Sequence, residues 1–405
     1  MVTPRLASIV IIDDNPGLKR RDQETPRKRQ RVESEDDERT SEPKPVPSGS
    51  APRVKIPTET IAERDPIFFK LDPDATIVIR VASVLFKVHR QILSCSDIME
   101  ACLKDHEAQF GGTSELAPLV FGAPTLDEYR AFLWAIYATQ EELGVPPASD
   151  DELNRLFDVA SLGGKYYITQ LEAWVAFSLS HAAKNSSLID SCSSATLSRF
   201  VKLAISHKWF TVLEQVTDKW CERLLVKSTP SVPAIQVVDQ YEESSRVEIR
   251  KLRGIAYYVH VQDMLDRQGN PTEAGATHLR TDPKLNSKQV TKLLAGYLSL
   301  TALWERLRLN PVELPPSESC SQETHVKCRS TWQRRWTSAA GWKRIMGHSS
   351  ADILALLNTL QDQLSNDDDL RAGLTSDCRR QGLGEIKLLK DNIQGSLADH
   401  FVGCI

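Results

Sequence analysis

Two strand-forming segments joined by a tight link, and followed at once by helix starts, constrain the fold more than any other feature. The first segment is TIVIRV at Thr76–Val81, which is rich in the β-branched residues that favour sheets. The link Ala82-Ser83 leads to the second segment, LFKV at Leu85–Val88. We predict that these two segments pair as a hairpin. The unit is too compact to contain a catalytic loop.

Further elements follow in quick succession up to about residue 182. Asp127 and Glu128 lie in the first turn of one predicted helix, where the helix dipole favours negative charge. The glycine pair Gly111-Gly112 predicts a long and loose loop before the third strand. In chain order, we expect helices at His89–Leu93 and Asp97–Leu103, a strand at Leu116–Phe121, and helices that begin near Pro124, Asp150 and Tyr167.

The order of these elements resembles a BTB/POZ domain of the type expanded in basidiomycete fungi. The signature positions of the resemblance lie in the segment LFKVHRQILSCS and are Phe86, His89, Arg90, Leu93 and Ser96. The resemblance implies an α+β domain over residues 64–182, in which a small sheet is capped by a helical cluster. It also implies a protein that binds other proteins, forms a homodimer through this domain and catalyses no reaction.

Two departures from the BTB/POZ pattern concern the partner. Repressor-type BTB domains combine an Asp at the start of the first strand with an Arg after the His, whereas this chain has Thr76 and Arg90. Cullin-binding adaptors carry a hydrophobic-x-acidic motif after the second helix, and residues 104–112 lack a clean match. We therefore favour a scaffold or adaptor function. The alternatives are a substrate adaptor of a cullin-type ubiquitin ligase and a nuclear transcription-associated regulator.

Residues 186–405 lose the strand signal and show apolar residues at helical spacing. The first stripe consists of Val247, Leu252, Ile255, Ala256 and Val259. The second consists of Ile353, Leu356, Leu357, Leu360 and Leu364, and the third of Ile386, Leu389, Ile393 and Leu397. Each stripe needs a partner surface. We therefore predict an all-α C-terminal region whose helices pack on one another, with loops at Gly269–Pro271 and Asn310–Pro316.

Residues 1–63 are rich in proline, serine and charged residues, and they contain almost no aromatic residues. Such a segment buries too little apolar surface to offset its chain entropy, so we predict a disordered tail. Two basic clusters in this tail are typical of a bipartite nuclear localisation signal, which predicts an import receptor as a partner and a nuclear location. The alternative is a solvated basic run balanced by the acidic residues 33–38. The basic residues are Lys19, Arg20, Arg21, Arg27, Lys28, Arg29 and Arg31.

A second motif in the tail is a β-branched run followed by acids, which resembles a SUMO-interacting motif. Such a run can add a strand to the edge of a partner's sheet. A chance apolar patch is an equally good interpretation. The residues are Ile9, Val10, Ile11, Ile12, Asp13 and Asp14.

Composition argues against several classes of function. The chain has 405 residues and a net charge of -4, which implies no general attraction to nucleic acid or to membrane surfaces. No apolar run approaches the length that spans a bilayer. The 8 scattered cysteines predict reduced thiols in a cytosolic or nuclear protein. We find no phosphate-binding glycine loop, because Gly163-Gly164-Lys165 lacks the required spacing, and no nucleophile elbow, so no enzyme and no cofactor are expected.

One group of residues has ligands of the kind that zinc prefers. Cys320, His325 and Cys328, with His348 further along, could supply four ligands. Their spacing is not that of a common zinc finger, so we assign no metal from the sequence. The neighbouring Trp332, Trp336 and Trp342 lie close to helical spacing, and we interpret them as core residues.

Overall fold

The strand-forming segments build a four-stranded mixed sheet in the order β1-β3-β2-β4. The computed structural model describes residues 62–121, 124–266 and 282–402. The strands are β1 (Glu63–Phe69), β2 (Ile77–Val81), β3 (Val84–Val88) and β4 (Leu119–Val120). β2 and β3 pair antiparallel, as the hairpin prediction requires, while β1 runs parallel to β3 and β4 runs parallel to β2. The prediction of a small sheet followed by helices is confirmed.

The tight hairpin between β2 and β3 depends on the backbone conformation of Ala82. Its φ of 51° lies in the left-handed region, which allows a short link to match the twist of the flanking strands. Ile79 and Phe86 lie opposite each other on the two strands, and both are fully buried. Residues on β2 and β3 are buried at nearly every position, so both faces of the sheet are covered.

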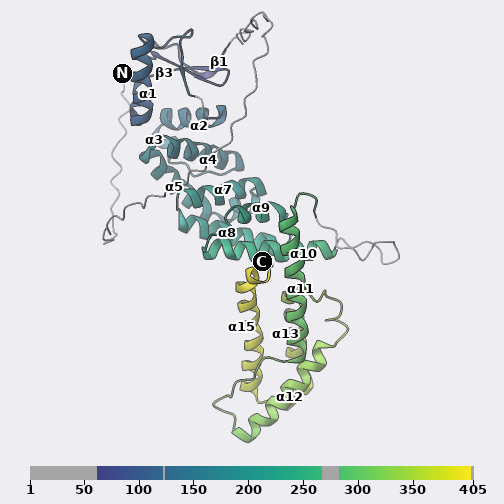
Figure 1. Ribbon diagram of the computed structural model, residues 1–405. Helices are drawn as coiled ribbons and strands as arrows, with labels where there is room; N and C mark the ends of the chain where they lie inside the picture. The colour runs from purple at the N-terminus through teal and green to yellow at the C-terminus, as the bar shows by residue number, and fades with distance from the viewer. Residues whose placement is uncertain (1–61, 122–123, 267–281, 403–405) are drawn as a thin grey trace, which may run out of the picture. The chain divides into compact units, whose positions relative to one another are not determined.

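Helices that begin at capping residues follow the sheet. Ser96 accepts a hydrogen bond from the backbone N–H of Met99, and Thr125 forms a capping box with Glu128. The helix at Leu126–Tyr137 packs on the helix at Asp150–Lys165 (Figure 1). The elements are η1 (Arg90–Cys95), α1 (Asp97–Phe110), α2 (Leu126–Tyr137), α3 (Gln140–Leu143), α4 (Asp150–Lys165) and α5 (Thr169–Lys184).

Three predictions for this part of the chain are corrected by the structure. The first predicted helix is the short 3-10 helix η1. α1 continues to Phe110, so residues 104–110 are helical rather than part of a loose loop, because no helix breaker occurs before Gly111, whose φ is 72°. The third strand, β4, has only 2 residues, whereas the sequence predicts a strand over Leu116–Phe121. Leu116 is 100% exposed and lies outside the sheet.

The described part of residues 186–405 is helical, as predicted. α7 packs on α4 and α8 packs on α5, so these helices extend the packing of the N-terminal part and share its core. Arg199 of α7 donates to Asp158 at 2.6 Å and to Asn154 at 2.8 Å, both on α4. The helices are α6 (Ser186–Ser191), α7 (Ser194–Ser206), α8 (Phe210–Leu225), α9 (Val232–Gln240), α10 (Val247–Asp266), α11 (Ser287–Leu309), α12 (Gln322–Ala340), α13 (Ile353–Ser365), α14 (Asp368–Gly373) and α15 (Ser376–His400).

Most residues of the three predicted stripes are buried, and α10 is buried on nearly all sides by α8, α9, α11 and α15. Val247 is an exception, since it lies at the first position of α10 and is 75% exposed. Leu389 is only partly buried. Trp332 and Trp336 are core residues, whereas Trp342 lies beyond the end of α12 and is 37% exposed, which corrects the prediction for this residue. Figure 1 shows α15 running beside α13 towards α10.

Several sequence predictions concern residues outside the described ranges. These are the disordered tail up to residue 61, the localisation signal at residues 19–31, the SUMO-interacting motif at residues 9–14 and the loop at 269–271. The loop at Asn310–Pro316 lies within the described part and contains no helix or strand, as predicted. Within the described ranges, no helix is long and apolar enough to cross a membrane.

Candidate functional site

The residues on which the sequence resemblance to BTB/POZ domains rests join the sheet to the surrounding helices. Phe86 packs edge-on against Tyr129 of α2, with ring centroids 4.9 Å apart. The ring nitrogen Nδ1 of His89 lies 2.8 Å from the hydroxyl of Tyr137, at the end of the same helix. Leu93 is fully buried. Ser96 caps α1 and donates from its hydroxyl to the carbonyl of Tyr166, after α4, at 2.7 Å. These residues therefore hold the sheet against the surrounding helices.

Arg90 is neutralised by a partner on α1. Its Nη2 donates to Glu107 Oε2 at 3.0 Å, and its Nη1 also contacts that carboxylate. The hydrogen bond from Arg90 lowers the pKa of Glu107. The arginine charge is therefore compensated within the first helices.

An ion pair between a buried carboxylate and a partly exposed arginine, which the sequence did not reveal, ties β1 to α2. Asp65 is 2% exposed, and its Oδ2 accepts a hydrogen bond from Arg130 Nε at 2.8 Å. Its Oδ1 accepts from the backbone N–H groups of Ile67 and Phe68 at 3.0 and 2.9 Å. Desolvation alone would raise the pKa of Asp65, but these hydrogen bonds hold it below its usual value.

We expect Asp65→Asn to lower the free energy of unfolding at neutral pH by about 1–3 kcal/mol, because Arg130 loses its partner and an amide replaces one acceptor with a donor. Because the folded-state pKa is depressed, this contribution is present above the unfolded pKa of about 3.9 and is lost as the pH falls through the folded value. Urea unfolding at pH 7 and at about pH 3 should show the difference between variant and wild type narrowing in acid. A difference that does not change with pH would contradict this assignment.

The outer face of α1 carries apolar and small side chains at helical spacing. The helix buries only Met99 and Leu103, and it packs mainly on η1. Ile98 is 40% exposed. Ala101 and Cys102 are exposed beside it. Positions 98, 101 and 102 share one side of a helix, so these residues form a small apolar patch that faces solvent.

Two groups inside the helical region combine residue types that also occur in catalytic sets. Ser231 Oγ lies 2.9 Å from His260 Nδ1, and both side chains are buried. Asp239 accepts hydrogen bonds from Tyr257 at 2.7 Å and from Lys292 at 3.1 Å. Burial and the neighbouring carboxylate of Asp239 raise the pKa of Tyr257. These contacts join α9, α10 and α11 in the core.

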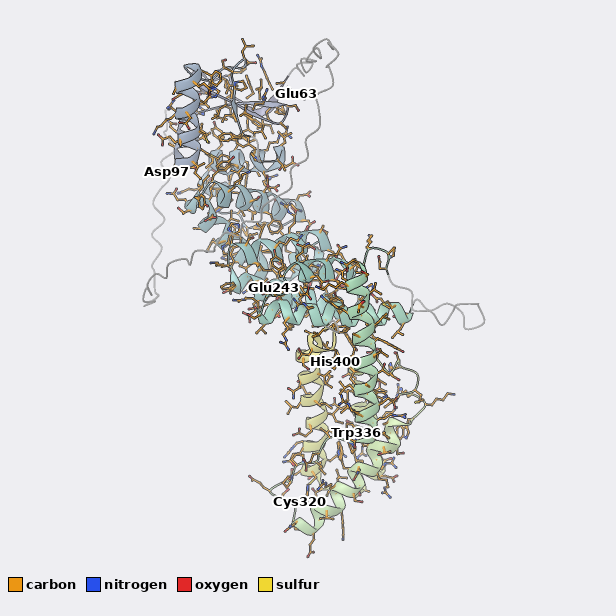
Figure 2. The ribbon with its side chains drawn as sticks, in the orientation of Figure 1. Glu63, Asp97, Glu243, Cys320, Trp336 and His400 are labelled. Atoms are coloured by element: carbon orange, nitrogen blue, oxygen red, sulfur yellow. The ribbon has the colours of Figure 1, made fainter. Side chains whose placement is uncertain are left out.

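Three cysteines meet where α12 and α15 begin. The thiol sulfurs of Cys320, Cys328 and Cys378 all lie within 4.8 Å of one another. Cys328 and Cys378 are buried, and Cys320 is partly buried. His325 Nδ1 lies 3.6 Å from the sulfur of Cys378. Figure 2 shows Cys320 at one end of α12 and Trp336 farther along the same helix.

The caps of both helices place these side chains. Ser321 caps α12, and His325 and Cys328 follow three residues apart on one side of that helix. Thr375 caps α15 and puts Cys378 in its first turn. Desolvation and the neighbouring thiols of Cys378 and Cys328 raise the pKa of Cys320 to about 11. The cluster could hold a metal with thiols from α12, from the loop before it and from α15, which are far apart in the sequence.

The structure changes the group of metal-ligating residues that the sequence suggested. Cys320, His325 and Cys328 lie near one another, as their spacing allows. His348 does not join them, because its Nε2 lies 3.0 Å from the hydroxyl of Thr359. Cys378 takes the place of His348, and no motif around this cysteine marks it in the sequence.

Comparison with known proteins found no family model, no curated protein and no solved structure that matches this chain.

Proposed function

We propose that this protein is a non-enzymatic protein–protein interaction scaffold, in which residues 64–182 form a BTB/POZ-like module that associates with a second copy of itself. The observation that carries the proposal is the order and pairing of elements. An antiparallel hairpin β2-β3 leads into η1 and α1, β4 returns beside β2, and α2, α4 and α5 follow. This order agrees with the resemblance of the sequence.

The outer face of α1 is the surface that we propose for self-association. Its patch of Ile98, Ala101 and Cys102 is apolar and lies on a helix whose other side is already packed. A two-fold dimer brings the same patch of both copies together, so a small apolar strip on a helix can cover itself. The proposal places the functional surface in a helix–helix contact between two copies.

Ile98→Glu tests this surface. Each dimer would contain two such glutamates, and burying unpaired charge at the contact is expected to weaken dimerisation at least about tenfold. The measurement is the mass of the full chain by light scattering over a series of concentrations. The matched control is Leu298→Glu, an equally drastic change at a residue of α11 that is 66% exposed.

The two variants separate the outcomes. If wild type and Leu298→Glu form dimers and Ile98→Glu is monomeric with an unchanged circular dichroism spectrum, the proposed surface is supported. A wild-type chain that is monomeric throughout the concentration series, or an Ile98→Glu variant that dimerises like wild type, contradicts it.

A further inference from the structure

We propose that Cys320, Cys328 and Cys378 bind a Zn²⁺ ion that fastens the start of α12 to the start of α15, with the imidazole of His325 as the fourth ligand. The three sulfurs come from two helices and the loop before one of them, and they converge at one end of both helices. This proposal does not depend on the self-association of α1.

The distances suit tetrahedral zinc. With Zn–S bonds of about 2.3 Å and Zn–N bonds of about 2.0–2.1 Å, tetrahedral angles place two sulfurs about 3.8 Å apart and a nitrogen about 3.6 Å from a sulfur. The sulfurs of this cluster lie within 4.8 Å of one another, and His325 Nδ1 lies 3.6 Å from Cys378. His325 is not within that 4.8 Å limit of all three sulfurs, so its ring has to turn inward when the metal binds.

The chemistry of the donors selects the metal. Soft thiolate ligands favour zinc over magnesium, calcium or manganese, which prefer oxygen. Three cysteines and one histidine are a common ligand set of structural zinc sites, in which all four positions are filled by protein and no water is left to react. The site is therefore suited to holding two helices together and leaves no open position for catalysis.

Contacts around the cluster hold the loop before α12 against α15. The hydroxyl of Ser319 donates to the carboxylate of Asp377, the residue before Cys378. Arg380 donates to the other oxygen of Asp377 at 2.8 Å. One turn beyond Cys378, a Cβ on Gly382 would come within 3.0 Å of the Trp332 ring, so α12 and α15 approach closely here. The backbone that carries the ligands is thus positioned by contacts other than the metal.

The test measures metal in the full chain. Purified protein is stripped with a chelator under reducing conditions, titrated with Zn²⁺ alone and assayed for bound metal by elemental analysis. We expect one zinc per chain and protection of three thiols against alkylation. Cobalt(II) in place of zinc should give the visible absorption of a tetrahedral site with thiolate ligands.

Variants assign the ligands. Cys320→Ser, at the partly buried position, should weaken zinc binding by more than the roughly 10–100-fold that the loss of an outer-shell partner costs. His325→Ala should weaken it as well and alter the cobalt spectrum, while the thiolate bands remain. Cys95→Ser, at a cysteine of η1 that is partly buried like Cys320 and lies outside the cluster, is the matched control and should bind zinc like wild type.

Two results would overturn the proposal, and neither requires a variant to fold. One is wild-type protein with all thiols reduced that binds no zinc at micromolar free metal. The other is freshly isolated protein in which mass spectrometry finds a disulfide between two of the three cysteines instead of bound metal.

Discussion

Replacing Trp336 with alanine is expected to lower the free energy of unfolding by about 3–5 kcal/mol. The indole is fully buried, and its ring centroid lies 5.9 Å from that of Trp332. Its Nε1 donates to the carbonyl of Leu307, in the last turn of α11, at 2.9 Å. The substitution removes apolar contacts, leaves a cavity and takes the donor away from that carbonyl. Urea unfolding followed by far-ultraviolet circular dichroism measures the loss.

Trp342→Ala is the matched control for this prediction. Trp342 follows the same helix, but it is 37% exposed and is not part of the buried pair. We expect its replacement to change the free energy of unfolding by less than about 1 kcal/mol. Equal losses for the two variants would mean that α12 does not pack against α11 in the way described.

Gly254→Ala is expected to lower the free energy of unfolding by about 1–3 kcal/mol, although alanine favours helices more than glycine does. A Cβ at this position of α10 would lie 2.5 Å from the backbone nitrogen of Ala398 and 2.9 Å from the Cβ of Leu397, both on α15. Because one of these atoms belongs to the backbone, the contact is relieved only if the two helices move apart. The melting temperature of the variant should fall.

Gly395→Ala is expected to raise the free energy of unfolding, in contrast to Gly254→Ala. This glycine lies within α15, and a Cβ there would meet nothing within 4 Å. The substitution should raise the free energy of unfolding by up to about 1 kcal/mol, because alanine lowers the entropy cost of the helix without a clash. If both glycine variants stabilise the protein, α10 and α15 do not approach each other as closely as described.

Local signals in the sequence were sufficient to locate most elements. The β-branched run before Ala82 predicts β2, and the acidic residues Asp127 and Glu128 mark the first turn of α2. The local sequence signals predicted the ends of helices less well than their positions. Nothing local distinguishes the 3-10 geometry of η1 from an α-helix, and Gly111 ends α1 later than the sequence pattern alone indicates. Boundaries depend on how the chain packs beyond the local pattern.

In the candidate sites, some contacts could be predicted from the sequence and others could not. His325 and Cys328 lie close together because three residues along a helix bring side chains to one side, and this spacing is visible in the sequence. Cys378 joins them only because α15 returns beside α12, and Asp65 meets Arg130 only because β1 and α2 lie together. Contacts between segments that are distant in the chain depend on the packing of whole helices. No local pattern in the sequence predicts these contacts.

The sequence by itself determined the strand-turn-strand opening, the helical character of the C-terminal region and the burial of most apolar stripes, because β-branched runs, capping residues and apolar periodicity act over a few neighbouring residues. Only the tertiary structure decided which polar groups are paired and which cysteines converge. It placed Arg90 against Glu107 and left Val247 in solvent. It also brought the thiol of Cys378 to those of Cys320 and Cys328. The physical reason is that pairing and burial depend on which surfaces meet, and the segments that meet can be far apart in the chain, such as Ser319 and Asp377 at a separation of 58.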